Sequence, residues 1–421
     1  MAVIMLPGVS MSALVQRQLT VNLWGHLSGG FGLGEGARCT MRSLQAAGVR
    51  VQVHDLPLAT HVNDQPTRPA AQILPAAVDL IHTNPNVLRQ TDGLAERLQL
   101  KAPLRIGFWA WELEDFPSGW ESGFIGLDQL WCPSSFSATS LGLRSPIPVT
   151  PLPHLIDWER ADAIHRQRQV LKRQRSTADF VCVYLFDLWS TVGRKNPYGV
   201  IDAFQQAFPF SQAAGHRLPD ARLVLKVGSG SQFPQELASL RQRISHDSRI
   251  QLIDAHLTRE QLDQILINSD VMIHLHRAEG FGLAMAEAMA AGIAVVATGY
   301  SGNLDFMPPG SSALVDADLV PILCSEGDYR CGSFWGEPNI DQAATYLRAL
   351  STDPDVRFRL SQSGRQAVQR LLAPERLGKI VKQRLGCLLA QAGRAELIRN
   401  LPLENPFRVL EGQIDERFRL R

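Results

Sequence analysis

The chain has 421 residues, 45% of them hydrophobic, and a formal net charge of +1 at pH 7. This length can supply two or three domains with their own cores, and the near-neutral charge argues against a general nucleic-acid binder. No apolar run reaches the roughly 18–20 residues that cross a bilayer, and the 6 cysteines form no C-x-x-C pair of a zinc site. We interpret residues 1–18 as a loosely packed lead-in rather than a signal peptide, and we expect a cytoplasmic protein with reduced thiols.

Two series of short apolar runs follow one another along the chain, separated by helical patterns. The first series comprises 19–24, 49–56, 78–83, 104–111 and 129–134, and the second comprises 179–186, 221–227, 249–255, 271–276 and 293–299. Strands this apolar indicate parallel sheets that are covered by helices on both faces. The sequence therefore predicts an α/β protein with two doubly wound, Rossmann-like domains.

A glycine-rich stretch, GHLSGGFGLGEGAR at 25–38, follows the first predicted strand. Gly32, Gly34 and Ala37 fit a relaxed dinucleotide fingerprint, and Asp55 stands about 20 residues further on. This reading predicts a nicotinamide-dependent oxidoreductase. A lone fingerprint with alanine in its third place is weak, and such an enzyme has no use for the acidic motif near residue 280.

Polar side chains close two later strands of the first series. His82 ends the run 78–83, and the stretch WELEDFPSGW at 111–120 begins with Trp111 and Glu112. Aromatic faces can stack on sugars while carboxylates accept hydrogen bonds from hydroxyl groups, so this stretch is a candidate carbohydrate site. The alternative is a loop that caps the core.

A charged stretch, 159–179, follows a proline-rich segment and marks the predicted boundary between the domains. We interpret it as a solvated surface helix, with a role at a membrane surface as the alternative. The predicted domains are 1–165 and 166–370, and the remainder, 371–421, is predicted to form helices.

The first strand of the second series leads into FDLWSTVGRKNPYG, where a helix is predicted to open at Asn196 and Pro197. Arg194 and Lys195 then stand at a strand-to-helix crossing, where adjacent cations can neutralise a diphosphate. Ser190 could add a hydroxyl group, and Asn196 is a further candidate for donor binding. The alternative is a surface turn with ordinary solvated charges.

A second crossing of the same sheet carries HRAEGFGLAMAEAMAAG, 276–292, with a helix predicted from about Leu283. Gly280 and Gly282, on either side of Phe281, allow the backbone to approach a ligand, and free N–H groups at the helix start can hold phosphate oxygens. Phe281 and Leu283 are therefore candidates for donor binding together with the two glycines. Glu279 would meet sugar hydroxyls or a developing positive charge, and Glu287 could accept two hydrogen bonds from a ribose diol. The alternative is a tight turn whose glutamate interacts favourably with the helix dipole.

These motifs together resemble glycosyltransferase family 4, whose members have the GT-B fold of two facing Rossmann-like domains with a cleft between them. The resemblance implies that Glu279 and Glu287 contact sugar and ribose, that Lys195 and Arg194 bind the diphosphate, and that the last helices return to the first domain. It also places the glycine-rich loop, with Gly32 and Gly34, over the donor phosphates. The matching residues are Arg194 to Pro197, Glu279 to Glu287, and Ser301-Gly302-Asn303.

The sequence departs from the family at two places. Phe186-Asp187-Leu188 stands where many members carry a second arginine, which leaves that role to Arg194 and Ser190. Many members also place a histidine at the end of a strand of the first domain. Here that strand ends in Trp111 and Glu112, so Glu112 or His82 is the candidate on the acceptor side.

We therefore predict a retaining glycosyltransferase that moves a hexosyl unit from a nucleotide sugar to a glycan, lipid-linked or other hydroxyl acceptor. The alternatives are a sugar-nucleotide epimerase of the same fold and a catalytically inactive carbohydrate-binding relative. No cofactor or metal is expected, because Arg194 and Lys195 supply positive charge and the patterns 316–318 and 353–355 look like accidental D-x-D pairs. The expected location is the cytoplasm, with peripheral contact to the inner face of a membrane left open.

Overall fold

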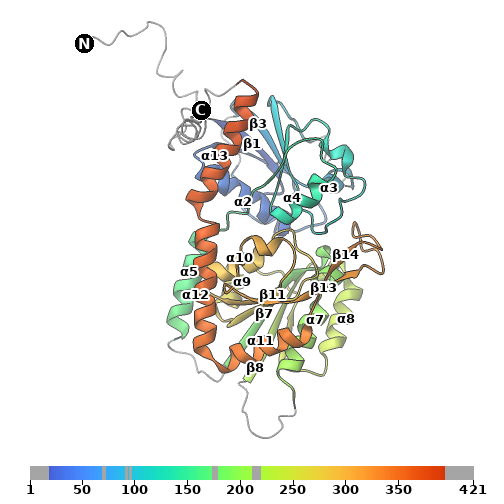
Figure 1. Ribbon diagram of the computed structural model, residues 1–421, viewed down its shortest axis with the longest axis vertical. Helices are drawn as coiled ribbons and strands as arrows, with labels where there is room; N and C mark the ends of the chain where they lie inside the picture. The colour runs from blue at the N-terminus through green and yellow to red at the C-terminus, as the bar shows by residue number, and fades with distance from the viewer. Residues whose placement is uncertain are drawn as a thin grey trace, which may run out of the picture. The chain divides into compact units, whose positions relative to one another are not determined.

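The computed structural model describes residues 19–68, 73–90, 93, 97–172, 179–210 and 220–393. Its described residues divide into two compact units, 19–108 with 125–130 and 374–393, and 109–124 with 131–373 (Figure 1). The sequence interpretations of 1–18 and of the chain beyond residue 393 lie outside the described residues, as do residues 173–178 of the charged stretch.

The first sheet has the strand order β2-β1-β3-β4-β5-β6, and β1 pairs in parallel with both β2 and β3. Every residue of β1 and β3 is buried, as expected for strands that are covered on both faces. In the first unit α13 packs along α2 (Figure 1), and Gly378 lies against the backbone at Ala46. Its elements are β1 Thr20–Gly25, α2 Gly32–Ala46, β2 Arg50–Asp55, β3 Val78–His82, α3 Pro85–Gln90, β4 Leu104–Phe108 and α13 Pro374–Gln391, and β5 Gln129–Cys132 runs across the boundary.

The second sheet has the order β12-β11-β10-β7-β8-β9, and its neighbouring strands all pair in parallel. The chain reverses its direction of winding between β7 and β10, which makes their carboxyl ends the topological switch point of this sheet. Helix α11 packs on α7, and α12 packs on α10 (Figure 1).

The helices of the second unit are η1 Glu121–Phe124, α4 Ser135–Gly142, α5 Trp158–Lys172, η2 Leu188–Ser190, α6 Val192–Lys195, α7 Pro197–Ala207, η3 Gly230–Gln232, α8 Pro234–Ile244, α9 Arg259–Ile267, α10 Leu283–Ala290, η4 Gly302–Asp305, α11 Ile340–Thr352 and α12 Pro354–Leu371. Its strands are β6 Val149–Pro151, β7 Asp179–Asp187, β8 Asp220–Gly228, β9 Ile250–Ile253, β10 Val271–His274, β11 Ala294–Thr298, β12 Ala313–Val315, β13 Ala317–Pro321 and β14 Phe334–Pro338.

All ten predicted strands are present, and the predicted α/β class with two Rossmann-like domains is confirmed. The predicted strand at 104–111 ends early, at Phe108, and the one at 271–276 ends at His274. Four strands were not predicted: β6 and β12, which have only three residues each, and the antiparallel pair β13 and β14. Short edge strands and an isolated hairpin leave too brief an apolar pattern to be recognised.

Helix α5 spans the charged stretch, and the prediction of a solvated surface helix is wrong for one of its faces. Arg168 is buried and donates hydrogen bonds to the carbonyl oxygens of Leu266 and Ser269, at 2.6 and 2.5 Å. These carbonyls lie at and beyond the end of α9, where a helix leaves acceptors without internal partners. Among the described residues, no helix is both long and apolar enough to span a membrane.

Candidate functional site

The crossing from β7 to α7 is built by capping residues. Thr191, with φ 60°, leads into α6, and Asn196, with φ 52°, caps α7 in the left-handed conformation. The side chain of Asn196 accepts a hydrogen bond from the Gly199 amide at 3.1 Å and donates to the Leu275 carbonyl at 3.0 Å. Pro197 is the first residue of α7, as predicted. The Asn196 amide group is thus used to fix the turn, and the donor-binding role of Asn196 stays a prediction.

The crossing from β10 to α10 turns at Gly282, whose φ of +93° favours glycine. Helix α10 begins at Leu283, as predicted. The Glu279 amide donates to the Ser301 hydroxyl at 2.8 Å, which ties this turn to the loop after β11. The Phe281 ring is buried against His154 and Phe306, and the donor-binding role of Phe281 stays a prediction.

The structure brings Glu112, Arg194, Lys195 and Glu279 together, and we call these four residues the charged cluster. Lys195 Nζ forms an ion pair with Glu279 Oε1, and Arg194 Nη1 lies 3.5 Å from the same oxygen. Burial by itself would raise the pKa of Glu279, but the cations of Lys195 and Arg194 hold that pKa well below its usual value. Glu279 is therefore a carboxylate at neutral pH.

Arg194 is the most buried cation of the cluster, with 3% of its surface exposed. Its Nη1 donates to the Ala278 carbonyl at 2.8 Å, but its Nε has no hydrogen-bond partner within the described residues. A buried donor without an acceptor costs about 1–3 kcal/mol. An anionic ligand would supply the missing acceptor.

Glu112 joins the cluster from the segment after β4. Its Oε1 lies 3.9 Å from Arg194 Nη2, and its Oε2 lies 3.0 Å from the Tyr329 hydroxyl. Burial raises the pKa of Glu112, and Arg194 opposes that rise. Trp111 is buried against Trp120 and Tyr329, so the prediction that its ring offers a sugar-stacking surface is corrected.

Glu287, in the second turn of α10, has one carboxylate oxygen engaged. Its Oε2 lies 3.2 Å from Arg160 Nη1, and the Arg160 guanidinium also binds Asp263 at 2.6 Å. Helix α5 therefore fixes the orientation of Glu287 through Arg160. Ser190, at the end of η2, and Leu283 are half-buried at the two crossings.

In the first unit, His82 is buried, which contradicts its predicted acceptor-side role. Its Nδ1 lies 3.0 Å from the Thr40 hydroxyl, and its ring stacks on Phe108 at 4.1 Å. Gly32 begins α2, and a Cβ on Gly34 would lie 2.7 Å from the His26 carbonyl oxygen. Both glycines therefore lie inside the helix rather than in the turn before it, which removes the basis of the dinucleotide-fingerprint interpretation.

The two D-x-D patterns have local structural roles. Asp353 caps α12 by accepting hydrogen bonds from two backbone amides, as a proline turn that opens a helix requires. Asp316 directly follows β12 and is paired with Gln342 at 3.1 Å. β12 lies at the edge of the sheet, two strands away from the switch point. In the part of the chain that the structure describes, no group of three His, Cys, Asp or Glu could hold a metal ion.

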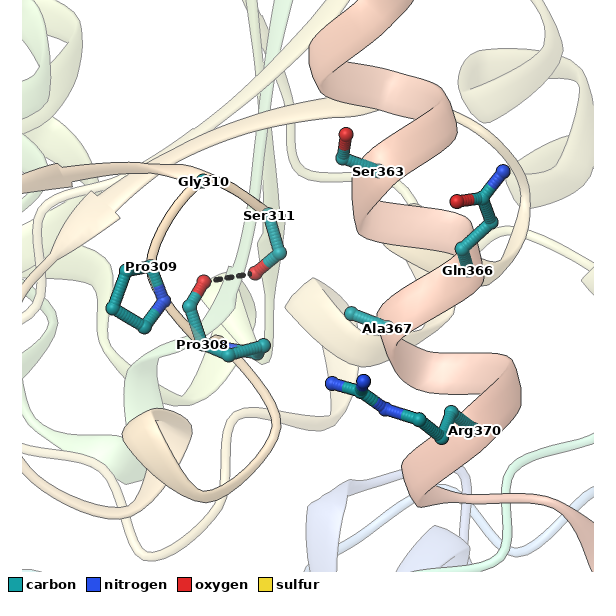
Figure 2. Close-up of a pocket in the computed structure, with 8 residues that line it drawn as sticks. All are labelled: Pro308, Pro309, Gly310, Ser311, Ser363, Gln366, Ala367 and Arg370. Atoms are coloured by element: carbon teal, nitrogen blue, oxygen red, sulfur yellow. Dashed lines mark hydrogen bonds between the residues drawn. The ribbon is translucent and has the colours of Figure 1, made fainter.

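A separate pocket of about 420 Å³ lies between the turn at 308–311 and α12 (Figure 2). It shares no residue with the charged cluster, and the Ser311 hydroxyl in its wall donates to the Pro308 carbonyl at 2.7 Å. Arg370 is its only charged lining residue. We therefore place the candidate site at the cluster.

Sequence reasoning missed Arg160, Ser301 as a backbone tie, and the hairpin residues Glu326 and Tyr329. Ser301 belongs to a recognised motif, but its bond to the Glu279 amide has no local signal, and the other three residues lie far along the chain from the residues they contact. Arg160 was only one of many charges in a basic stretch. A loop tyrosine outside any motif gives no indication of its partners.

One family model matches part of the second unit. Residues 189–324 match a family model described as Glycosyl transferases group 1, a segment that includes Arg194, Lys195, Glu279 and Glu287. No curated protein sequence matches the chain significantly.

Solved structures match over most of the chain. HepE of Anabaena, in complex with UDP and glucose, is 13% identical with a TM-score of 0.58, over 88% of this chain and 100% of that one. Sucrose-phosphate synthase of Thermosynechococcus elongatus is 16% identical with a TM-score of 0.61, over 89% and 100%. A glycosyltransferase of Rickettsia africae is 11% identical with a TM-score of 0.60, over 88% and 99%.

At these identities the solved structures establish the fold. This protein has the GT-B fold, as predicted. Its second unit carries the segment that is typical of group 1 glycosyl transferases, which supports a glycosyltransferase.

Proposed function

We propose that this protein is a retaining, metal-independent glycosyltransferase that uses a nucleotide-sugar donor. One observation carries the proposal: Arg194, Lys195 and Glu279 converge at the carboxyl ends of β7 and β10, the switch point where open α/β sheets bind ligands. The buried, unpartnered Nε of Arg194 supports an anionic ligand at this place.

The proposed chemistry assigns a separate role to each charge. The bond from the anomeric carbon to the diphosphate breaks, and Arg194 and Lys195 stabilise the charge that develops on the departing phosphate oxygen. The acceptor hydroxyl forms the new bond on the same face of the sugar, and its proton passes to the departing diphosphate. Glu279 binds donor sugar hydroxyls or stabilises positive charge at the anomeric carbon. Without a donor, the diphosphate-binding cations are neutralised by Glu279 and Glu112.

We propose a UDP-hexose as the first donor to test, because solved structures of HepE contain UDP and UDP-glucose. Glu287, with its second oxygen, would accept hydrogen bonds from the ribose diol. The acceptor is a glycan, a lipid-linked saccharide or another hydroxyl compound. In this proposal Arg194 and Lys195 supply the positive charge that a metal ion would otherwise supply, and no cofactor takes part. A cytoplasmic enzyme with peripheral contact to a membrane would reach such acceptors.

The test is a thermal-shift and calorimetric screen with UDP, GDP, ADP and their glucose conjugates, followed by chromatography of the products. A ligand present at 100 times its Kd stabilises the native state by about 2.7 kcal/mol. We expect one nucleoside diphosphate to stabilise the protein, and its sugar conjugate to be hydrolysed slowly without an acceptor. Stabilisation by none of these ligands would overturn the proposal. Conversion of one sugar nucleotide into another would indicate an epimerase, and binding without turnover would indicate an inactive relative.

A further inference from the structure

The β13–β14 hairpin is fixed at its base to the turn that carries Glu279. Arg277 binds both carboxylate oxygens of Glu337, from Nε at 2.5 Å and from Nη2 at 2.9 Å. The Gly336 amide donates to the Arg277 carbonyl at 2.9 Å, and the guanidinium lies 5.4 Å from the centre of the Trp335 ring. Arg277 is two residues before Glu279. The hairpin is thus anchored beside the proposed site by a bidentate ion pair.

The loop of the hairpin, residues 322–333, reaches the charged cluster at two points. Glu326 Oε2 accepts a hydrogen bond from the Gly193 amide at 3.1 Å, next to Arg194. Tyr329 stacks on Trp111, with ring centres 5.5 Å apart and an interplanar angle of 16°. The Arg194 guanidinium lies 5.5 Å from the centre of the Tyr329 ring. One aromatic side chain therefore restricts both Trp111 and Arg194.

The Tyr329 hydroxyl is the direct link to Glu112. It donates to Glu112 Oε2 at 3.0 Å, while Glu112 Oε1 faces Arg194 at 3.9 Å. A hydrogen bond donated to a carboxylate favours its charged form and fixes its orientation. One carboxylate oxygen of Glu112 therefore contacts the hairpin, and the other faces Arg194, the proposed diphosphate-binding residue.

We propose that the β13–β14 hairpin regulates the anion-binding site, and that Tyr329 is a positioning residue that holds Glu112 against Arg194. The proposal rests on the proposed function, since it assumes that Arg194 binds the donor diphosphate. In this arrangement Tyr329 touches no substrate atom. It acts by setting the charge and orientation of Glu112, and so the freedom of the Arg194 guanidinium to meet an anion.

The proposal makes a pH-dependent prediction with a definite sign. Arg194 and Lys195 from α6, Glu279 from the β10–α10 turn, and Tyr329 from the hairpin act on Glu112. An anion that binds Arg194 competes with the Glu112 carboxylate, so binding tightens as the pH falls and Glu112 takes up a proton. Removal of the Tyr329 hydroxyl raises the pKa of Glu112, because the carboxylate loses a donor. As the pH is lowered, the affinity of this variant for the anion should therefore begin to rise at a higher pH than that of the wild type.

The experiment measures the Kd of UDP, and of inorganic pyrophosphate as a base-free probe, by calorimetry between pH 5 and 9. Each Kd is corrected for proton uptake by the probe itself, since the second pKa of a terminal phosphate is about 6. The transition is the pH range over which the corrected Kd changes. The variants are Tyr329→Phe, Glu112→Gln and the double variant, with Leu323→Ala, an exposed position of the same loop, as the control. We expect the transition in Tyr329→Phe to move up by about one pH unit, since a hydrogen bond to a charged group contributes roughly 1.5 kcal/mol. Glu112→Gln should abolish the transition, and the double variant should match Glu112→Gln.

Two results would overturn the proposal. In the first, Tyr329→Phe superimposes on the wild type at every pH while its thermal stability changes. In the second, the transition persists in Glu112→Gln. Failure of the wild type to bind either probe would instead contradict the proposed function, so the two failures are distinguishable.

Discussion

Each sheet has a switch point, between β1 and β3 in the first and between β7 and β10 in the second, and the two differ in how their polar groups are satisfied. At the first, His26 is held by the Leu56 carbonyl at 2.6 Å and the Thr83 hydroxyl at 2.9 Å. Arg38 pairs with Glu35 at 2.8 Å and donates to two carbonyls of the loop before α2. At the second, Arg194, Lys195 and Glu279 meet, and Arg194 keeps a buried donor unpartnered within the described residues.

Both switch points follow a buried strand and carry glycines before a helix, so glycine content does not separate them. The difference lies in the origin of the charges. Glu35 and Arg38 are three residues apart on one helix, and they neutralise each other locally. The charged cluster draws its members from segments far apart in sequence, and its cations are held by groups that a ligand could displace. Polar groups that are paired within one segment stabilise the fold. Charges that are brought together from distant segments can instead bind an anion.

The largest expected effect comes from Glu279→Gln. It should lower kcat for sugar transfer or donor hydrolysis by at least ~100-fold, in line with loss of one preorganised electrostatic contact. The matched control is Glu35→Gln, a carboxylate that also pairs with two cations and is similarly buried, at 12% side-chain exposure against 9% for Glu279. Equal losses in both variants would remove the distinction between the two switch points.

Next in size is Lys195→Ala. It should weaken binding of the nucleoside diphosphate by about 10- to 100-fold and leave binding of the free nucleoside nearly unchanged, since a charge-assisted contact is worth roughly 1.5–3 kcal/mol. Calorimetry with UDP and uridine measures both affinities. Arg38→Ala, which removes a cation from the first switch point, is the control and should affect neither. If Lys195→Ala weakens both ligands equally, the lysine has a structural role instead.

Glu287→Ala should show the opposite selectivity: it should weaken the binding of uridine and leave the binding of pyrophosphate unchanged, because the proposed contact of Glu287 is with ribose.

Arg160→Ala should cause a smaller loss of uridine affinity, about three- to tenfold, because Arg160 orients Glu287 without touching the ligand. Asp162→Ala removes another ion pair of α5, with Arg365 at 2.5 Å, and controls for loss of helix packing. Arg160 is only structural if both α5 variants lower Tm and neither changes uridine affinity.

The smallest expected effect is no change at all. Transfer activity should survive exhaustive EDTA treatment and should not rise when magnesium or manganese is added, because Arg194 and Lys195 provide the positive charge. The measurement is the initial rate before treatment, after treatment and after addition of metal. Activity that collapses in EDTA and returns with metal would contradict the proposed role of the cations and would require a search for carboxylate ligands.

The sequence by itself determined the fold class and the two crossings of the second sheet. Apolar runs of strand length and helical patterns of a different period are local properties, so β7, β10 and the starts of α7 and α10 could be placed within two residues. The motifs around Arg194 and Glu279 also lie in the segments that follow β7 and β10, and these neighbouring parallel strands bring the two segments close together.

Only the tertiary structure decided which polar groups are available to a ligand. It buried His82 and Trp111, and it used the Asn196 side chain as a helix cap. It also brought Tyr329 to Glu112, 217 residues away in sequence. The physical reason is that hydrogen-bond partners and burial depend on strand order and loop packing between distant segments. A single sequence records the local pattern of each segment, but not which distant segment satisfies its polar groups.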